Sequence, residues 1–451
     1  MSLATRALAA LALIAGFYAL ALGTVAGLLW LVWLDVQNGR IYVELLLVVG
    51  ALSVLILWAI VPRRTRFEAP GPRLQRDEQP ELFALVEEVA RAARQSMPTE
   101  VYLAAEVNAS VLQTGRRRVM TLGLPLMQVL TVPQFRAVIA HEFGHFDGGD
   151  TWLAPLVHRA HVAIERAVEA LDDGILNKPF AWYGALFLRG TRAVSRAQEI
   201  AADALAARIA GARQMADALL AIASASASHE VYWSRVVLPL LEHGYRPPLA
   251  AGFAHFVVTS EVEMVVAEGS DPLDSHPPLH ERLSVLGHAS AGQSEDAAPR
   301  AISLLRDLPR LEAELIPGDA VSWEDAGPIV YLPHWQEKRA RHAAALREVT
   351  ALGLPKIAAT LPDFSERLRL TPEDGEQTAA ASAIVSGAFA VKLHELGWMC
   401  DAMPGKPIAF TRDGKRIEPF RLLDRLRGGE LGADAWEAEC REAGLERVSL
   451  V

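Results

Sequence analysis

Two uncharged apolar runs near the N-terminus constrain this 451-residue chain more than any other feature of its sequence. The first run covers Ala7 to Leu34, and the second covers Leu45 to Val61 after a short polar break. A helix needs about 20 apolar residues to cross a hydrocarbon core roughly 30 Å thick. The runs therefore predict a transmembrane helical hairpin in residues 1–66, with helices over about 7–34 and 43–62.

A cleaved signal peptide is the alternative for the first run, because Arg6 precedes it and Ala19-Leu20-Ala21 resembles a cleavage site. The apolar core of a signal peptide is only about 7–15 residues long, so the length of the run favours a membrane anchor. Orientation follows from the arginines that flank the second run, since the cytoplasmic side of a membrane protein carries the excess of basic residues. Three arginines, Arg63, Arg64 and Arg66, follow the second run, whereas the turn between the two runs contains only Arg40. The rule predicts a multi-pass protein of the inner cell membrane, with everything after Pro62 in the cytoplasm.

Charge and cysteine content exclude two classes of protein. The formal net charge of -10 argues against nucleic acid as a partner, which would need a basic surface. The only cysteines are Cys400 and Cys440, too few for a disulfide framework and suited to a reducing compartment. The lipid bilayer is therefore the partner that composition itself indicates.

Helical and strand patterns alternate along the rest of the chain. A helix is predicted over Pro80 to Arg94, a strand over Val101 to Val107 and a partner strand over Arg118 to Leu122. Asp413-Gly414 is a favoured hairpin turn. The sequence changes character near residue 290, which predicts one domain over 67–290 and a C-terminal accessory domain of unknown role over 291–451. The expected fold class is mainly α (α+β), with a small β-sheet in the first of these domains and a small α+β C-terminal domain.

The stretch AHEFGHFDGGD, Ala140 to Asp150, carries the chemistry. Thr131 and Gln134 have the spacing of a capping box, and Pro133 suits a first helical turn, so a helix is predicted from Thr131 to Phe146. Gly148-Gly149 would end this helix.

Three residues of that helix suit a hydrolytic metal site. Residues four apart on a helix differ by about 40° in direction, so His141 and His145 reach the same ion. Glu142 projects at about 100° from His141, beside the ion, where it can hold a water molecule. Zinc suits neutral imidazoles and lowers the pKa of its bound water to about 7, so Glu142 can take the proton as that water attacks a peptide carbonyl. An ordinary amphipathic helix with histidines at its edge is the competing interpretation.

Two places could supply the third ligand. One zincin class has a histidine six residues after the second histidine, but here that position is Thr151. The other source is a glutamate on a second helix, predicted over about Thr191 to Ala210. Glu199 and Asp203 share a face there, so one can bind metal while the other hydrogen-bonds an imidazole. A solvated acidic face is the alternative for this pair.

The three segments HEFGH, SRAQEIAAD (195–203) and SHPPLHERL (275–283) together resemble, in order and spacing, the membrane zinc peptidases that include CAAX prenyl protease 1 and bacterial HtpX. The resemblance covers about residues 80–285. It implies that His141, His145 and Glu199 bind one Zn²⁺ per chain in a zincin-type helical metallopeptidase domain. It also implies Glu142 as the general base and Asp203 as the carboxylate that orients a ligand histidine.

The resemblance extends to residues beside the metal. His276 and Arg282 resemble residues that flank the family's active site, where they would assist the oxyanion or brace the Glu199 helix. A proline-rich turn before a helix is the alternative for this segment. Asn108 and Ala109 resemble the edge segment of the family's cleft, where a substrate could add as a strand.

The hypothesis is a membrane-anchored zinc endopeptidase, a hydrolase of protein or peptide substrates, with membrane protein quality control as its setting by analogy. The C-terminal domain would bind a protein partner. The alternative is a non-catalytic scaffold with a structural metal site, which would not need Glu142 and which usually takes four protein ligands. Charged residues interrupt the segment 151–195, and its apolar stretch from Phe180 to Leu188 is too short to cross a bilayer. The catalytic domain is therefore expected to sit on the membrane rather than inside a ring of helices.

Overall fold

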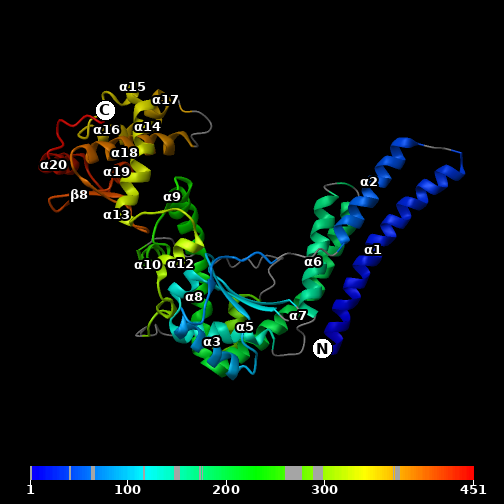
Figure 1. The fold of residues 1–451 in the computed structure, drawn as a ribbon. Coiled ribbons are helices and arrows are strands. Elements are labelled where there is room, and N and C mark those ends of the chain that lie inside the picture. The colour runs from blue at the N-terminus through cyan, green and yellow to red at the C-terminus, as the bar shows by residue number, and fades with distance from the viewer. Residues whose placement is uncertain are drawn as a thin grey trace.

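The computed structural model divides into three parts, a membrane-type helical hairpin, a central domain and a C-terminal domain (Figure 1). The mainly helical α+β class predicted from the sequence is confirmed. The structure describes residues 3–39, 42–61, 67–114, 117–146, 153–171, 174, 176–259, 277–287, 298–368, 370 and 376–451.

The N-terminal part consists of α1 (Leu3–Gln37) and α2 (Val43–Ile60), close to the predicted helices. Among the described residues, two helices are long and apolar enough to cross a membrane, Leu8–Gln37 and Val43–Ile60. Beside them stand α6 (Leu153–Ala170) and the first half of α7 (Asn177–Ala210), so four helices share one apolar core (Figure 1). The predicted helix from Thr191 is thus the second half of a 34-residue helix.

The central domain has a four-stranded sheet in the order β1-β2-β4-β3. Its strands are β1 (Arg73–Leu74), β2 (Glu100–Ala104), β3 (Ala109–Thr114) and β4 (Arg117–Gly123). The predicted strand pair is confirmed: β2 and β4 run parallel, with Val101 opposite Met120. The additional strand β3 lies antiparallel to β4 at the edge of the sheet.

Helices cover this sheet, and the helix with the two histidines is buried among them. They are α3 (Pro80–Ala92), α4 (Leu124–Val129), α5 (Val132–Gly144) and α8 (Ala212–Tyr232). The predicted capping box is present at the start of α5: Thr131 N–H donates to Gln134 Oε1 at 2.8 Å, and Gln134 N–H donates to Thr131 Oγ1 at 3.5 Å. α5 ends at Gly144 with His145 as its C-cap, two residues before the predicted end at Phe146, and Gly148-Gly149 lie outside the described residues.

Residues 301–330 complete the core of the central domain. Ala301, Leu311 and Trp323 are buried in the same cluster as Phe135 of α5. The elements after α8 are η1 (Trp233–Val237), α9 (Leu238–Glu242), β5 (Tyr245–Arg246), α10 (Leu249–Thr259), α11 (Leu279–Val285), η2 (Ala301–Leu304), α12 (Leu308–Leu315), β6 (Asp319–Ala320), α13 (Trp323–Ala326) and η3 (Gly327–Tyr331). The domain boundary near residue 290 stays a prediction, and the hydrophobic contacts of these residues continue past it.

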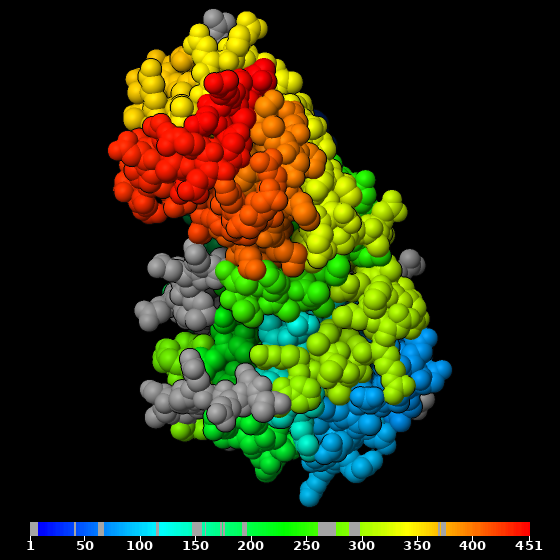
Figure 2. Space-filling model, turned by 90° about the vertical axis from the view of Figure 1, so that its left-hand side faces the viewer, coloured from blue at the N-terminus to red at the C-terminus, as the bar shows by residue number. Residues whose placement is uncertain are grey.

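The C-terminal domain has its own hydrophobic core and stacks on the central domain (Figure 2). Its helices are α14 (Leu332–Arg341), α15 (Ala343–Leu346), α16 (Leu354–Ala359), α17 (Leu361–Arg367), α18 (Gln377–Glu395), α19 (Pro419–Arg427) and α20 (Ala433–Ala443). Three antiparallel strands, β7 (Met399–Asp401), β8 (Ala409–Arg412) and β9 (Lys415–Ile417), form its sheet. The predicted hairpin is confirmed, since Asp413 and Gly414 join β8 to β9 with φ of 52° and 77°.

Candidate metal centre

Two closely packed helices, α5 and α7, form the site. They can approach because Gly144 of α5 faces Ala202 of α7. A Cβ atom on Gly144 would lie 2.7 Å from Ala202 Cα and 2.9 Å from Ala202 Cβ. Small residues on both helices therefore let Glu199 of α7, and Asp203 one turn after it, reach the histidines of α5.

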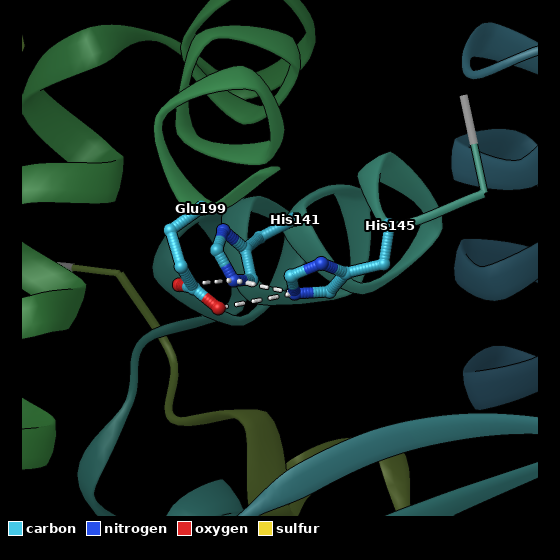
Figure 3. A group of neighbouring side chains, drawn as sticks. All are labelled: His141, His145 and Glu199. Carbon is cyan, nitrogen blue, oxygen red and sulfur yellow. Dashed lines mark hydrogen bonds and ion pairs between the residues drawn. The ribbon is translucent and has the colours of Figure 1, made fainter. Parts of the chain in front are cut away.

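The three predicted ligands lie together at the distances a tetrahedral metal needs (Figure 3). His141 Nε2 lies 3.2 Å from His145 Nε2 and 3.6 Å from Glu199 Oε2. His145 Nε2 lies 3.7 Å from Glu199 Oε1. Bonds of about 2.0–2.1 Å to a tetrahedral zinc ion separate its ligand atoms by about 3.3 Å. The donor set of two imidazoles and one carboxylate thus fits zinc and leaves a fourth position open.

A hydrogen-bonded carboxylate fixes the first histidine. Asp203 Oδ1 lies 2.9 Å from His141 Nδ1, so Nε2 is left to face the cluster. Arg282 of α11 holds Asp203 through two bonds, Nε to Oδ2 at 2.8 Å and Nη2 to Oδ1 at 2.6 Å. Arg282 Nη1 also lies 3.6 Å from Glu199 Oε2. Asp203 and Arg282 therefore form one buried network with His141 and Glu199, and the supporting roles that the resemblance implied for them stay predictions.

These contacts keep both supporting groups charged although both are buried. Burial opposes ionisation of Asp203, but hydrogen bonds with Arg282 and His141 outweigh burial and lower the pKa of Asp203. Burial likewise acts to lower the pKa of Arg282, but the hydrogen bond to Asp203 and the nearby carboxylates outweigh it, so the pKa of Arg282 is raised. Glu142 is one of those carboxylates, which places its charge near Arg282.

Of the remaining predicted residues, Glu142, Asn108 and Ala109 are described in the structure and His276 is not. Glu142 is partly buried on α5 next to His141, and His145 is 31% exposed, so this side of the cluster is open. Ala109 begins the edge strand β3, which contacts α5, and the carbonyl of the exposed Asn108 accepts a hydrogen bond from Gly123 N–H at 2.8 Å. His276 lies outside the described residues, so its role stays a prediction.

One pair beside the site was not predicted. Arg196 Nη2 of α7 donates to Glu281 Oε1 of α11, next to the Arg282 contacts. These residues stand 85 positions apart, so no local spacing could have indicated the pair. Outside the site, His161 pairs with Glu165 on its own helix at 3.0 Å.

A family model matches the central part of this chain, and known proteins match just under half of its length. Residues 76–290 match the model of peptidase family M48. The protein named Protease HtpX from Erwinia tasmaniensis is 25% identical over 234 residues, which cover 45% of this chain and 71% of that protein. Protease HtpX from Yersinia pestis strain Pestoides F is 25% identical over 248 residues, which cover 48% of this chain and 76% of that protein. No solved structure gives a significant match to this chain.

Proposed function

Residues 76–290 belong to peptidase family M48, and from this premise we propose that the chain is a membrane-anchored, zinc-dependent endopeptidase. The observation that carries the proposal is the cluster of His141, His145 and Glu199, whose ligand atoms lie within 4.8 Å of one another. Glu142 stands on α5 beside His141, and His145 is the C-cap residue of the same helix. Relatives named as proteases support the assignment to metalloprotease hydrolases.

Each residue of the site has a distinct task in this proposal. Zinc, when bound by His141, His145 and Glu199, would polarise a peptide carbonyl and acidify water. Glu142 takes a proton from the attacking water and delivers it to the leaving amine. Asp203 holds the His141 ring in the tautomer that leaves Nε2 free to bind metal. His276 is proposed as a second catalytic residue, and Asn108 with Ala109 as the edge that binds substrate.

The cellular setting belongs to the same proposal. The arginines after α2 support a multi-pass protein of the inner membrane, with the catalytic and C-terminal domains in the cytoplasm. Its substrates would be polypeptides, with membrane protein quality control as the setting. The C-terminal domain, with a core of its own, would bind a protein partner.

Metal content and casein cleavage of detergent-purified protein test the proposal. We expect one zinc ion per chain in the wild type, zinc without cleavage in Glu142→Gln, and neither zinc nor cleavage in Glu199→Ala. Full zinc occupancy in Glu199→Ala would show that the third ligand lies elsewhere. A wild type that binds zinc but cleaves nothing, with Glu142→Gln behaving identically, would favour the scaffold alternative.

A further inference from the structure

The first helix of the membrane hairpin is longer than a bilayer is thick. With 35 residues α1 is about 52 Å long, whereas a hydrocarbon core is roughly 30 Å thick. The 18 residues of α2 give about 27 Å, so the ends of α2 mark the two faces of the core. Ile60, the last residue of α2, shares a buried cluster with Phe17 of α1. With the hydrocarbon core placed between the ends of α2, the part of α1 before Phe17 would project from the core on the side of the catalytic domain.

At this same level α7 packs against α1. The rings of Phe17 and Phe180 lie 6.4 Å apart, and Tyr183 Oη donates to the Leu13 carbonyl at 2.7 Å. A Cβ atom on Gly190 would lie 2.4 Å from a methyl carbon of Leu13, so α7 packs closely against the Leu13 side chain there. The α6–α7 hairpin stands alongside α1 and α2 and points toward the same end of the molecule as the α1–α2 turn (Figure 1).

The outer surface of the α6–α7 hairpin carries charged residues that do not suit the hydrocarbon core of a bilayer. It also carries a tryptophan and a lysine that suit the membrane–water interface. The exposed positions of α6 include Arg159, Glu165 and Glu169. On α7, Trp182 is 66% exposed, and Lys178 is exposed one turn nearer the tip. Tryptophan is enriched at membrane–water interfaces, and lysine near it can extend its ammonium group into the headgroups.

We propose that the tip of the α6–α7 hairpin, meaning the described residues from Leu176 to Trp182, rests in the interface of the bilayer that α1 and α2 cross, with Trp182 as its anchor. The lipid interface is the occupant of this surface because the surface is continuous with the membrane hairpin through the shared core of Phe17, Phe180 and Ile60. The hairpin does not cross the bilayer.

The consequence for substrates rests on the proposed function. α7 runs without a break from Trp182 to Glu199, 17 positions later, which sets the metal site at most about 26 Å from the interface. An extended polypeptide covers about 3.3 Å per residue, so about eight residues span that distance. The enzyme would therefore cut membrane-anchored polypeptides several residues beyond the bilayer surface, and not within it.

Depth measurements in proteoliposomes test the placement of the tip. A bimane label on Ala181→Cys leaves Trp182 in place. The native thiols react slowly, since burial raises the pKa of Cys400 to about 11 and of Cys440 to about 12. Lipids carrying a shallow nitroxide should quench this label most strongly. Ala51→Cys, exposed near the middle of α2, is the deep control, and Arg159→Cys is the aqueous control. Strongest quenching by a deep nitroxide, or quenching only by iodide from water, would overturn the proposal.

A tethered substrate tests the consequence. Peptides with one transmembrane segment and linkers of 0 to about 16 residues before a cleavable sequence should be cut only once the linker reaches several residues. Trp182→Glu should cut tethered peptides several-fold more slowly than wild type while cutting casein equally, and Trp182→Tyr should restore the tethered rate. Equal loss on both substrates, or cleavage at zero linker length, would contradict the distance limit. A wild type inactive on casein would reject the proposed function, whereas the depth measurement would still decide the placement of the tip.

Discussion

At the scale of single residues, the site depends on the absence of one side chain. A Cβ atom on Gly144 would lie 2.7 Å from the Cα atom of Ala202 on α7, the helix that carries Glu199. Such a contact involves backbone, so it can be relieved only by moving α5 and α7 apart. Glu199 stands on the helix that would move.

We therefore expect Gly144→Ala to weaken zinc binding by about tenfold or more, as loss of supporting contacts around a metal commonly does. Overpacking should also destabilise the fold by about 1–3 kcal/mol. Competition with a zinc chelator measures the first effect and thermal unfolding the second. Gly50→Ala is the matched control, because nothing lies within 4 Å of its Cβ position. Zinc affinity equal to wild type in Gly144→Ala would show that the helices adapt without displacing Glu199.

The sequence predicted the individual residues of the site better than their contacts. Helical spacing put His141 and His145 on one face, because a four-residue step fixes direction on any helix. Glu199 can be the third ligand only if its helix packs against the helix of His141. No local pattern in the sequence predicts that packing, and only the resemblance implied it. The pairing of Arg196 with Glu281 depends on how α11 docks, and no local pattern encodes that docking.

At the scale of elements, α5 begins at the capping box that the spacing of Thr131 and Gln134 predicts. Thr131 Oγ1 accepts from one free N–H of the first turn, and Thr131 itself is buried. Thr131→Ala should lower the free energy of unfolding by about 0.5–2 kcal/mol, and Thr131→Ser should retain most of it. Chemical denaturation of the two variants measures the difference. Equal stability of Thr131→Ala and wild type would show that tertiary packing alone sets the start of α5.

The start of α7 was harder to predict than its end. Gly211, with φ of 103°, ends the helix as the sequence indicated. The start lies at Asn177, and Pro179 in the first turn is a signal that could have marked it. The charged residues between 151 and 195 made the first half of α7 hard to predict from hydrophobic periodicity. Packing on α1 and α6 stabilises this half of the helix.

At the scale of the whole molecule, one buried carboxyl joins α12 to the start of α10. Glu312 is 6% exposed, and its Oε1 accepts a hydrogen bond from Ala250 N–H at 2.8 Å. Burial raises the pKa of Glu312, although backbone hydrogen bonds and Arg246 partly offset the rise. The folded state therefore binds this proton more tightly than the unfolded state does. Its contribution to stability is complete below the unfolded pKa of about 4.5 and is lost as pH rises through the higher folded value.

Glu312→Gln removes this titration while keeping an oxygen acceptor for Ala250. The melting temperature of the variant minus that of wild type should therefore rise between about pH 4 and pH 8. Differential scanning fluorimetry across this pH range measures the difference. A difference independent of pH would mean that the Glu312 carboxyl titrates alike in the folded and unfolded states.

The contact between the C-terminal domain and α10 depends on a glycine in the left-handed region. Gly405 has φ of 79°, and a Cβ atom there would lie 2.9 Å from Phe256 Cα and 2.4 Å from Thr259 Oγ1. The adjacent Pro404 carbonyl accepts from Thr259 Oγ1 at 3.1 Å and lies 2.6 Å from His255 Nδ1. Backbone atoms of Phe256 leave no room for a side chain at position 405, so this contact in its present form needs glycine there.

Gly405→Ala should therefore loosen the C-terminal domain from α10 while each domain stays folded on its own core. Faster hydrogen exchange along α10, with zinc content unchanged, is the expected result. Gly414→Ala is the matched control, because Gly414 has a similar φ of 77° with nothing within 4 Å of its Cβ position. The control carries the same backbone strain without the clash, so it should leave exchange along α10 unaltered. Equally faster hydrogen exchange in both variants would show that backbone strain, and not the interface, causes the effect. Unchanged exchange in Gly405→Ala would show that other contacts hold the two domains together.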